Sequence, residues 1–413
     1  MVFDEIVDLE DAPARWSDAA HEAARLVFLL AGVSYYKAAA PPVIDLGDTP
    51  VRDGETAFLR RFYLEGLGEY AYRNQLDLSG LSIEGGVPAG PPVDHQPTRG
   101  RPLVPFGGGI DSIVSVDTVV ARHPGTALFV VSRRGARFEP IEQAAAHTGL
   151  PILRADRQLD PQILRSAQLG WRNGHVPVTG VLSAIAVLTA VLHDRDQVVM
   201  SNEWSSSIGN VDVDGQSINH QYSKSLAFEA GFRDVLAGSL TTPPAFFSFL
   251  RDRSELWVAR RFAELTDFHP VFRSCNRAFH IDPVKRLDHW CGQCDKCCFI
   301  DLVLAPFLPA EALRGIFGGR EPLEDEGLLP RFDSLLGIGP DFKPFECVGD
   351  VGECAAAVVL AADRADRQGQ PVLQRLRGQV AVEGEQIDAL LRPLGPSFVP
   401  DDYPRDAAHD QLV

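Results

Sequence analysis

The chain lacks an excess of basic residues, a long apolar run and a basic N-terminal signal, the features that would indicate binding to nucleic acid, insertion into a membrane or secretion. Its 39 basic residues are outnumbered by 56 acidic ones, and a net charge of −17 repels phosphate backbones and anionic lipids. The longest uncharged run, residues 176–192, contains Pro177 and Gly180 and is shorter than the roughly 20 apolar residues of a membrane span. The first 16 residues are acidic where a secretory signal would be basic. We therefore expect a cytoplasmic protein without nucleic-acid or membrane partners.

The composition is otherwise that of a globular protein, with 413 residues of which 45% are hydrophobic and 23% charged. This length predicts two or three domains. A segment rich in proline and glycine at residues 87–101 predicts a linker. We expect a small N-terminal α/β domain (1–86), a central domain (102–270), a cysteine-rich and helical segment (271–345), and a C-terminal helical region with a tail (346–413).

The central domain alternates apolar runs typical of strands with helical stretches. Strands are expected at residues 103–106, 127–132, 151–154 and 197–201, and helices at 111–122, 140–148 and 178–193. Such alternation predicts βαβ units and a doubly wound parallel sheet. Ligands of these sheets bind at the carboxyl ends of the strands, so functional residues should follow Phe106, Ser132 and Met200.

A glycine-rich loop follows the first of these strands and runs into a helix. Gly107, Gly108 and Gly109 allow backbone amides to approach an anion, and the helix N-terminus favours negative charge. Asp111 could hold Mg²⁺, and Ser112 could donate its hydroxyl to a phosphate. The alternative is an ordinary strand-to-helix turn capped by Asp111.

This loop, FGGGIDS, resembles the Ser-Gly-Gly-X-Asp-Ser motif of the PP-loop ATP pyrophosphatase superfamily. Gly107 replaces the leading serine of that motif. The resemblance implies a PP-loop (HUP-like) fold for residues 102–270 and an enzyme that cleaves ATP to AMP and diphosphate while adenylating a substrate. It also implies that Val131 and Ser132, at the end of the second strand, contact adenine.

Four cysteines have the spacing of a zinc site. Cys291, Cys294 and Cys297 follow the pattern of a zinc knuckle, and Cys275 can complete a tetrahedron. Four thiolates leave no open coordination position, which favours a structural Zn²⁺. Reduced unligated thiols and a redox or iron–sulfur role are the alternatives. A similar knuckle occurs in 7-cyano-7-deazaguanine synthase, itself a PP-loop enzyme.

A dense set of polar residues follows the fourth expected strand. So many amides and hydroxyls predict recognition of a multiply oxygenated substrate, although a solvated loop is the alternative. The candidate substrate residues are Asn202, Ser205, Ser206, Asn210, Asn219, Gln221, Ser223 and Ser225.

The motifs SYYKAAAP, FGGGIDSIVS, SNEWSSSIGN, NHQYSKSLAFE and WCGQCDKCCF together resemble the ATP-dependent UDP-N-acetylmuramoyl-L-alanyl-L-glutamate epimerase (MurL) family. The resemblance spans roughly residues 25 to 300. It implies a peptidoglycan-precursor enzyme whose substrate is a UDP-linked muramoyl dipeptide and which inverts the terminal L-glutamate, consuming ATP and water and releasing AMP and diphosphate. A PP-loop ligase or deazaguanine-type synthase, and a nucleotide-binding regulator, are the alternatives.

An acyl-adenylate removes the carboxylate charge that makes an α-proton weakly acidic, so an ordinary side chain can then act as the base. The candidates are His220, Lys224 and Glu203, in that order, because histidine titrates nearest to neutral pH. Lysine is scarce, with five in the chain, so Lys224 marks a place where a compact ammonium is wanted. Cys298, outside the zinc knuckle, is a weaker candidate.

Overall fold

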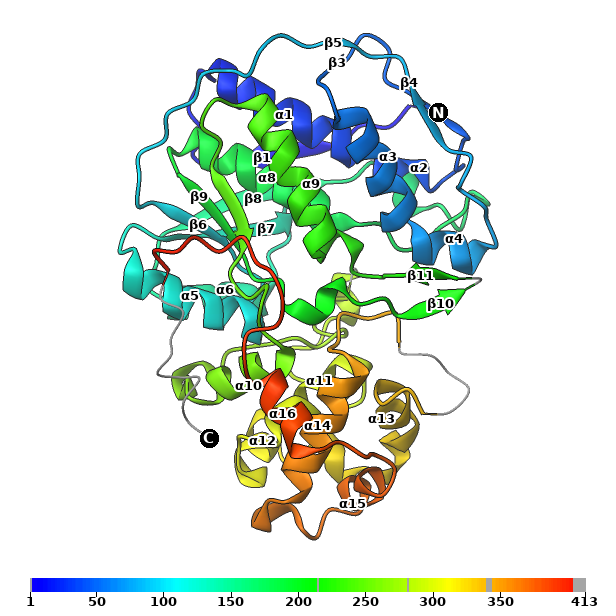
Figure 1. Cartoon of the computed structure of the whole chain (residues 1–413), viewed down its shortest axis with the longest axis vertical. Coiled ribbons are helices and arrows are strands. Elements are labelled where there is room, and N and C mark those ends of the chain that lie inside the picture. The colour runs from blue at the N-terminus through cyan, green and yellow to red at the C-terminus, as the bar shows by residue number, and fades with distance from the viewer. Residues whose placement is uncertain (1, 214, 281, 339–343, 404–413) are drawn as a thin grey trace.

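A computed structural model describes residues 2–213, 215–280, 282–338 and 344–403. Figure 1 shows a layered α/β part, which contains both the N-terminal and the central segments, above a smaller group of helices from the C-terminal third. The last ten residues of the expected tail, 404–413, lie outside the described residues. No helix in the described ranges has the length and apolarity required to cross a bilayer.

Six strands form the central sheet, in the order β1-β8-β7-β6-β9-β12. All neighbours are parallel except β1, which pairs antiparallel with β8. The predicted parallel sheet is therefore confirmed, with two strands that were not expected: an antiparallel strand, β1, at one edge and a parallel strand, β12, at the other. The strands are β1 (Ile6–Leu9), β6 (Pro102–Pro105), β7 (Ala127–Arg133), β8 (Ile152–Gln158), β9 (Gln197–Met200) and β12 (Ala245–Ser248).

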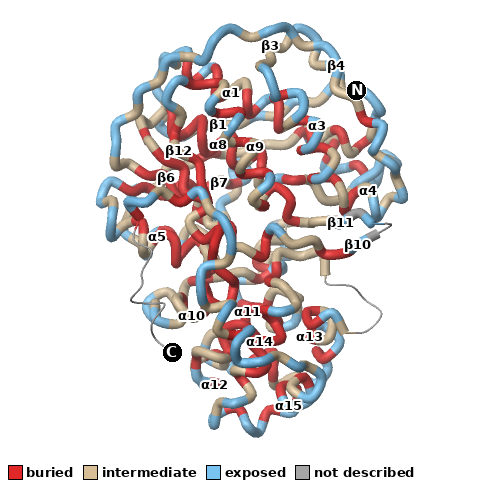
Figure 2. Tube along the Cα trace, in the orientation of Figure 1, coloured by how far each residue is buried: buried red, intermediate tan, exposed pale blue. Residues whose placement is uncertain are grey.

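The two faces of the sheet contribute to two hydrophobic cores because successive side chains of a strand point in opposite directions. In β6, Leu103 joins the core beneath α8, whereas Val104 joins the core beneath α5. Figure 2 shows the resulting buried layer through the middle of the molecule. The first face is covered by α1 (Asp18–Ala31), α3 (Glu55–Gly66), α8 (Val178–Leu192) and α9 (Leu226–Ser239), and the second by α5 (Ile110–Arg122), α6 (Glu139–His147) and α10 (Glu255–Ala263).

The first 86 residues share the sheet and core of the central domain, although we expected them to form a small domain of their own. Strand β1 lies at the sheet edge, and buried Leu26 and Leu30 of α1 share a core with Ile185 of α8. Helix α3 ends at Gly66, and α4 begins at Gly68 after the single residue Leu67. The other elements here are α2 (Val33–Tyr36), α4 (Gly68–Asn74), β2 (Val43–Asp45), β3 (Pro50–Val51), β4 (Ser82–Glu84) and β5 (Val87–Pro88).

The C-terminal third is a helical lobe that continues the core of the second face. Its fully buried Arg367 pairs with Glu321 at 3.0 Å and donates to the Ala305 carbonyl. The lobe contains α11 (Asp295–Leu304), α12 (Ala310–Ile316), α13 (Leu329–Leu335), α14 (Val351–Ala362), α15 (Pro371–Arg377) and α16 (Gly384–Leu390). A hairpin of β10 (Val211–Val213) and β11 (Gln216–Ile218) and the short helix α7 (Pro161–Leu164) complete the described elements longer than a 3₁₀ turn.

Candidate active site

The strand order reverses between β6 and β9, which places a topological switch point at the carboxyl ends of these two strands. A pocket of about 450 Å³ lies there. Among the residues expected from the sequence, those that line it are Gly107, Gly109, Asp111, Ser112, Val131, Asn202 and Lys224. The structure therefore brings the glycine loop, the end of the second strand and part of the polar segment to one place.

The glycine loop needs its glycines at two positions. Gly108 has φ +71°, a conformation that side chains disfavour, and a Cβ on Gly109 would lie 2.8 Å from the Ser274 hydroxyl. No side chain caps α5, whose N-cap is Gly109, so its first amides face the pocket unpaired by a cap. The Ser112 hydroxyl donates to the Gly109 carbonyl at 3.1 Å. The loop therefore has the features of an anion-binding helix N-terminus.

Three carboxylates converge beside this loop. Ligand atoms of Asp111, Glu203 and Glu255 lie within 4.8 Å of one another, and Oδ1 of Asp111 is buried without a hydrogen-bond partner. Burial and the charge of Glu203 raise the pKa of Asp111 to about 7, and burial with these two neighbouring carboxylates also raises the pKa of Glu255. Carboxylates so placed fit a divalent cation such as Mg²⁺, which would relieve their mutual repulsion.

Glu255 was missed by the sequence analysis. It is the first residue of α10 and follows the helix cap Ser254, so in sequence it looks like an ordinary acidic residue in a first helical turn. Only the packing of α10 against α5 brings it to Asp111.

Two of the scarce lysines, Lys224 and Lys296, line the same pocket. Burial alone would lower the pKa of Lys224, but Cys347, Glu203 and Asp111 raise it, so the ammonium is the stable form. The pocket thus combines a helix N-terminus and two ammonium groups with the Asp111 carboxylate, and Glu203 and Glu255 lie next to Asp111 outside the lining, a set suited to a metal-bound polyphosphate.

Arg251 holds the segments that carry Glu203 and Lys224. Its buried guanidinium donates to the main-chain carbonyls of both residues, at 2.9 Å and 2.5 Å, and forms an ion pair with Glu229. It also donates to the hydroxyls of Ser206 and Ser248. Arg251 was not expected from the sequence, because Glu229, Lys224 and Glu203 are 22, 27 and 48 positions away.

Most polar residues expected to bind substrate are engaged in hydrogen bonds within the protein. Side chains of the segment hold its own backbone: the Asn219 amide donates to the Ser206 carbonyl, and Ser225 caps α9 by accepting from Phe228. Asn210 donates to the Pro344 carbonyl. Ser205, Gln221 and Ser223 are buried, whereas Asn202 lines the pocket and donates to Ser248.

Ser132, expected at the adenine site with Val131, lines an adjacent pocket of about 470 Å³. Val131 belongs to both pockets, so the two are neighbours at the end of β7. Arg133, Arg157 and Arg286 also line the second pocket. Arginines can bind the phosphates of a nucleotide-linked ligand.

His220, the first candidate base, lies behind the pocket rather than in its lining. Its Nδ1 contacts the buried carboxylate of Glu69, and its ring lies 4.0 Å from that of His175. Burial alone would lower the pKa of His220, but its interactions with Cys347 and with the carboxylate of Glu69 raise it to about 9.

Cys347 was not singled out in the sequence because no second cysteine lies near it at a ligand spacing. In the structure its thiol interacts electrostatically with both His220 and Lys224. Burial alone would raise the pKa of this thiol, but Lys224, His220 and Lys296 lower it to about 6. Cys298, by contrast, is fully buried in the core, and its pKa is raised by burial.

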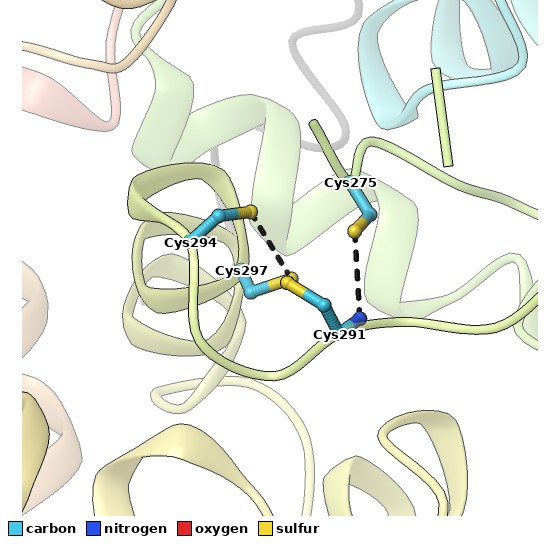
Figure 3. Close-up of side chains that lie close together, drawn as sticks. All are labelled: Cys275, Cys291, Cys294 and Cys297. Carbon is cyan, nitrogen blue, oxygen red and sulfur yellow. Dashed lines mark hydrogen bonds between the residues drawn. The ribbon is translucent and has the colours of Figure 1, made fainter. Parts of the chain in front are cut away.

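The four cysteines of the expected zinc site come together, as Figure 3 shows. The sulfur atoms of Cys294 and Cys297 are 3.5 Å apart, and those of Cys291 and Cys297 are 3.7 Å apart. All four are free thiols whose sulfur atoms lie within 4.8 Å of one another. This arrangement fits four-coordinate Zn²⁺, with α11 beginning directly after Cys294.

Comparisons with known proteins cover nearly the whole chain. The MurL N-terminal domain family matches residues 2–249, and the MurL C-terminal domain family matches residues 271–390. A UDP-N-acetyl-alpha-D-muramoyl-L-alanyl-L-glutamate epimerase from Xanthomonas oryzae pv. oryzae is 41% identical, over 91% of this chain and 82% of the relative. Proteins of the same name from Salinispora tropica and a Micromonospora species are 40% and 39% identical, over 92% and 93% of this chain and 82% and 85% of their own. No solved structure matches.

Proposed function

Because this chain belongs to the MurL family, we propose that it inverts the terminal L-glutamate of UDP-N-acetylmuramoyl-L-alanyl-L-glutamate, using ATP and releasing AMP and diphosphate. The relatives' names supply the epimerisation and the substrate. The observation that supports the use of ATP is the pocket at the switch point, which is lined by an uncapped helix N-terminus, Asp111 and two lysines, with Glu203 and Glu255 next to Asp111.

In this proposal the amides of the glycine loop and Lys296 bind the phosphates of ATP. Asp111, Glu203 and Glu255 would hold Mg²⁺, which when bound neutralises charge on the phosphates and on the departing diphosphate. The unpartnered Oδ1 of Asp111 supports this assignment, because a buried carboxylate oxygen without a partner is costly unless a cation or water meets it. Val131 lies where the adenine would pack.

The α-carboxylate of the glutamyl residue attacks the α-phosphorus of ATP, and diphosphate leaves. The acyl-adenylate no longer carries the carboxylate charge, and its carbonyl delocalises the electron pair left when the α-proton is removed. Reprotonation on the other face inverts the centre, and water then cleaves the adenylate to release AMP. Lys224, as an ammonium that lines the pocket, stabilises the negative charge that develops next to the carbonyl.

The second pocket extends the site in the direction of β8. We propose that it receives part of the nucleotide-linked substrate, because Arg133 and Arg286 offer guanidinium groups that suit a diphosphate. Arg286 also lies 4.1 Å over the ring of Phe138. The two adjoining pockets give the proposed reaction room for a substrate much larger than glutamate.

The test is incubation with ATP, Mg²⁺ and UDP-N-acetylmuramoyl-L-alanyl-L-glutamate in deuterated water. We expect AMP and diphosphate in equal amounts, D-glutamate on chiral analysis, and deuterium at the α-carbon when ATP is present. Exchange at the normal rate without ATP would overturn the adenylate mechanism. Formation of an amide or nitrile in place of D-glutamate would point to a ligase or synthase, and absence of turnover with ATP bound would point to a regulator.

A further inference from the structure

We propose that Glu69, His175 and His220 form a binding site for a divalent transition-metal ion, Zn²⁺ by its ligand chemistry, separate from the cysteine cluster and from the carboxylates beside Asp111. One carboxylate and two imidazoles supply the ligands, and a fourth coordination position stays open to water or another small ligand. The proposal concerns the bound ion and not the reaction, so it does not depend on the proposed function.

The donor atoms of the three side chains converge on one place, within 4.8 Å of one another. Nδ1 of His220 contacts Oε2 of Glu69, and Nδ1 of His175 is 4.0 Å from the same oxygen. Zn²⁺ bonds of about 2.0–2.2 Å place the ligand atoms of a tetrahedral ion roughly 3.3–3.6 Å apart. One of these pairs is closer than that spacing and the other is wider, so small side-chain rotations would bring all three donors to one ion.

The two imidazole rings lie against each other, with centroids 4.0 Å apart and planes tilted by 38°. Two imidazolium ions at this separation would repel each other strongly, so at least one ring is neutral and offers a nitrogen lone pair. An ion pair between His220 and Glu69 would account for one ring beside the carboxylate. A bound cation accounts for both, because it can accept a lone pair from each ring and is attracted to the carboxylate.

The surroundings of Glu69 have the character of an outer shell around a metal site. Nε of Arg73 donates to Oε1 of Glu69 at 2.6 Å, which leaves Oε2 to face the two histidines. The ring of Phe345 lies 6.4 Å from that of His220 and 5.0 Å from the guanidinium carbon of Arg73. A hydrogen-bonded carboxylate and an apolar neighbour are the usual supports of metal ligands. His175, the most exposed ligand at 23%, gives the ion a route from solvent.

The segments that carry the two histidines are also held in place. Gly174, directly before His175, packs so closely on Tyr70 that a Cβ at this position would lie 2.9 Å from the tyrosine ring. The backbone amide of His220 donates to the side chain of Asn210 at 2.9 Å. The ligands therefore come from three distant segments whose backbones are already fixed, which lowers the entropic cost of binding an ion.

The described part of the chain thus has three groups of potential metal ligands with different donor chemistry. The cysteine cluster offers four sulfur atoms, the group at Asp111 offers three carboxylates, and this site offers two nitrogens and one oxygen. Imidazole suits Zn²⁺ and other transition metals, whereas carboxylates suit Mg²⁺. We therefore expect this site to bind Zn²⁺ or Co²⁺ even when Mg²⁺ is in excess.

An ion at this site would connect α4 and the segment before α8 to the segment that follows β11. Lys224 comes four residues after His220 and lines the pocket at the switch point. The ion would therefore support the backbone that presents Lys224, in addition to the support given by Arg251.

The first experiment counts bound zinc by equilibrium dialysis against Zn²⁺ in excess Mg²⁺, followed by elemental analysis. We expect His175→Phe, which keeps a ring beside His220 but has no lone pair, to hold one Zn²⁺ fewer per chain than the wild type. The matched control is His123→Gln, because His123 is 12% exposed, as His220 is, and faces one carboxylate, that of Asp402, at 3.9 Å. This variant should hold as much zinc as the wild type. Equal zinc contents in the wild type and His175→Phe would overturn the proposal.

The second experiment identifies the donor atoms by titration with Co²⁺ in excess Mg²⁺. The difference between the wild-type and His175→Phe spectra should contain visible cobalt bands that saturate at one equivalent, without the near-ultraviolet charge-transfer band of a thiolate ligand. Glu69→Gln, which keeps the size of the side chain, should also weaken Co²⁺ binding by about 100-fold or more and guards against misfolding of the ring variant. The absence of a difference, or a difference that contains the sulfur band, would overturn the site.

Discussion

The guanidinium of Arg251 and the carboxylate of Glu229 form a fully buried ion pair, 2.9 Å apart and each about 2% exposed or less. Glu229 also accepts from the amide of Ser248, at the end of β12. Through Arg251 the pair reaches the carbonyls of Glu203 and Lys224. One ion pair therefore fixes the end of a strand, the start of α9 and the two segments that line the proposed active site.

Removing one partner of this pair should be strongly destabilising. We expect Glu229→Gln and Arg251→Met each to lower the free energy of unfolding by about 3–5 kcal/mol, because an uncompensated buried charge or several unpaired carbonyls would remain. The exposed pair between Arg134 and Asp8, 2.7 Å apart, is the control. Arg134→Gln should change stability by less than about 1 kcal/mol in the same urea titration. Equal effects at both sites would contradict the structural role of Arg251.

Substitutions in the glycine loop should impair the reaction with ATP without lowering the stability of the fold. We expect Asp111→Asn and Ser112→Ala to suppress AMP formation, the former by about 10²-fold or more, while the melting temperature stays near that of the wild type. The pKa of Asp111 is already raised by burial and by Glu203, so a neutral amide at this position relieves repulsion in the protein without metal. Near-full turnover of either variant at saturating Mg²⁺ would mean that the loop has been misinterpreted.

Mg²⁺ should stabilise the protein more at pH 8 than at pH 5.5. The folded-state pKa of Asp111, about 7, lies above the ordinary value of 3.8, so the folded protein binds the extra proton between these pH values. Stability from this group is therefore lost as pH rises through 7, and a cation replaces the proton. Thermal melts with and without Mg²⁺ test this. Asp111→Asn should reduce the pH dependence, and an Mg²⁺ effect independent of pH in the wild type would contradict the carboxylate site.

Zinc content and stability should fall together when the cysteine cluster is broken. Cys291→Ser and Cys294→Ser each remove one ligand of a four-thiolate site, and binding of a structural metal contributes to folding free energy. Elemental analysis of freshly purified protein and thermal melting measure the two effects. Cys298→Ala, which lies beside the cluster in sequence but is not part of it, should keep its zinc. Wild-type protein without zinc would indicate that the thiols are unligated.

Local sequence was sufficient where short-range chemistry sets the structure. The limits of four of the six strands of the central sheet, and of the helices α5, α6 and α8, could be predicted within a few residues, because apolar runs such as Val198–Met200 alternate with helical stretches such as 111–122. The glycine loop and the four clustered cysteines were also visible, since each motif completes its pattern within a few dozen residues. The family resemblance followed from such motifs and is confirmed by the family matches.

Other features depended on contacts between distant segments. Strand β1 has only four residues, one of them the acidic Asp8, and its place at the sheet edge depends on antiparallel pairing with the distant β8. Most side-chain amides and hydroxyls after β9 are hydrogen bonded to the backbone of their own segment. Composition alone cannot distinguish such groups from those that are free to bind a ligand. Sequence pointed to His220 as the candidate base from the ordinary pKa of histidine, whereas its position behind the pocket depends on Glu69, 151 residues away.

The sequence by itself determined the α/β class, the glycine-rich loop between a strand and a helix, the cysteine cluster and the family, because these are properties of residue type and spacing. The tertiary structure alone decided that Glu255 joins Asp111 and Glu203, that Arg251 supports both Glu203 and Lys224, and that Glu69 meets His175 and His220. Each of these relations is an electrostatic contact that acts over a few ångströms. Such a contact cannot be read from the linear sequence, because the charged groups interact strongly only after folding has brought them close together and away from water.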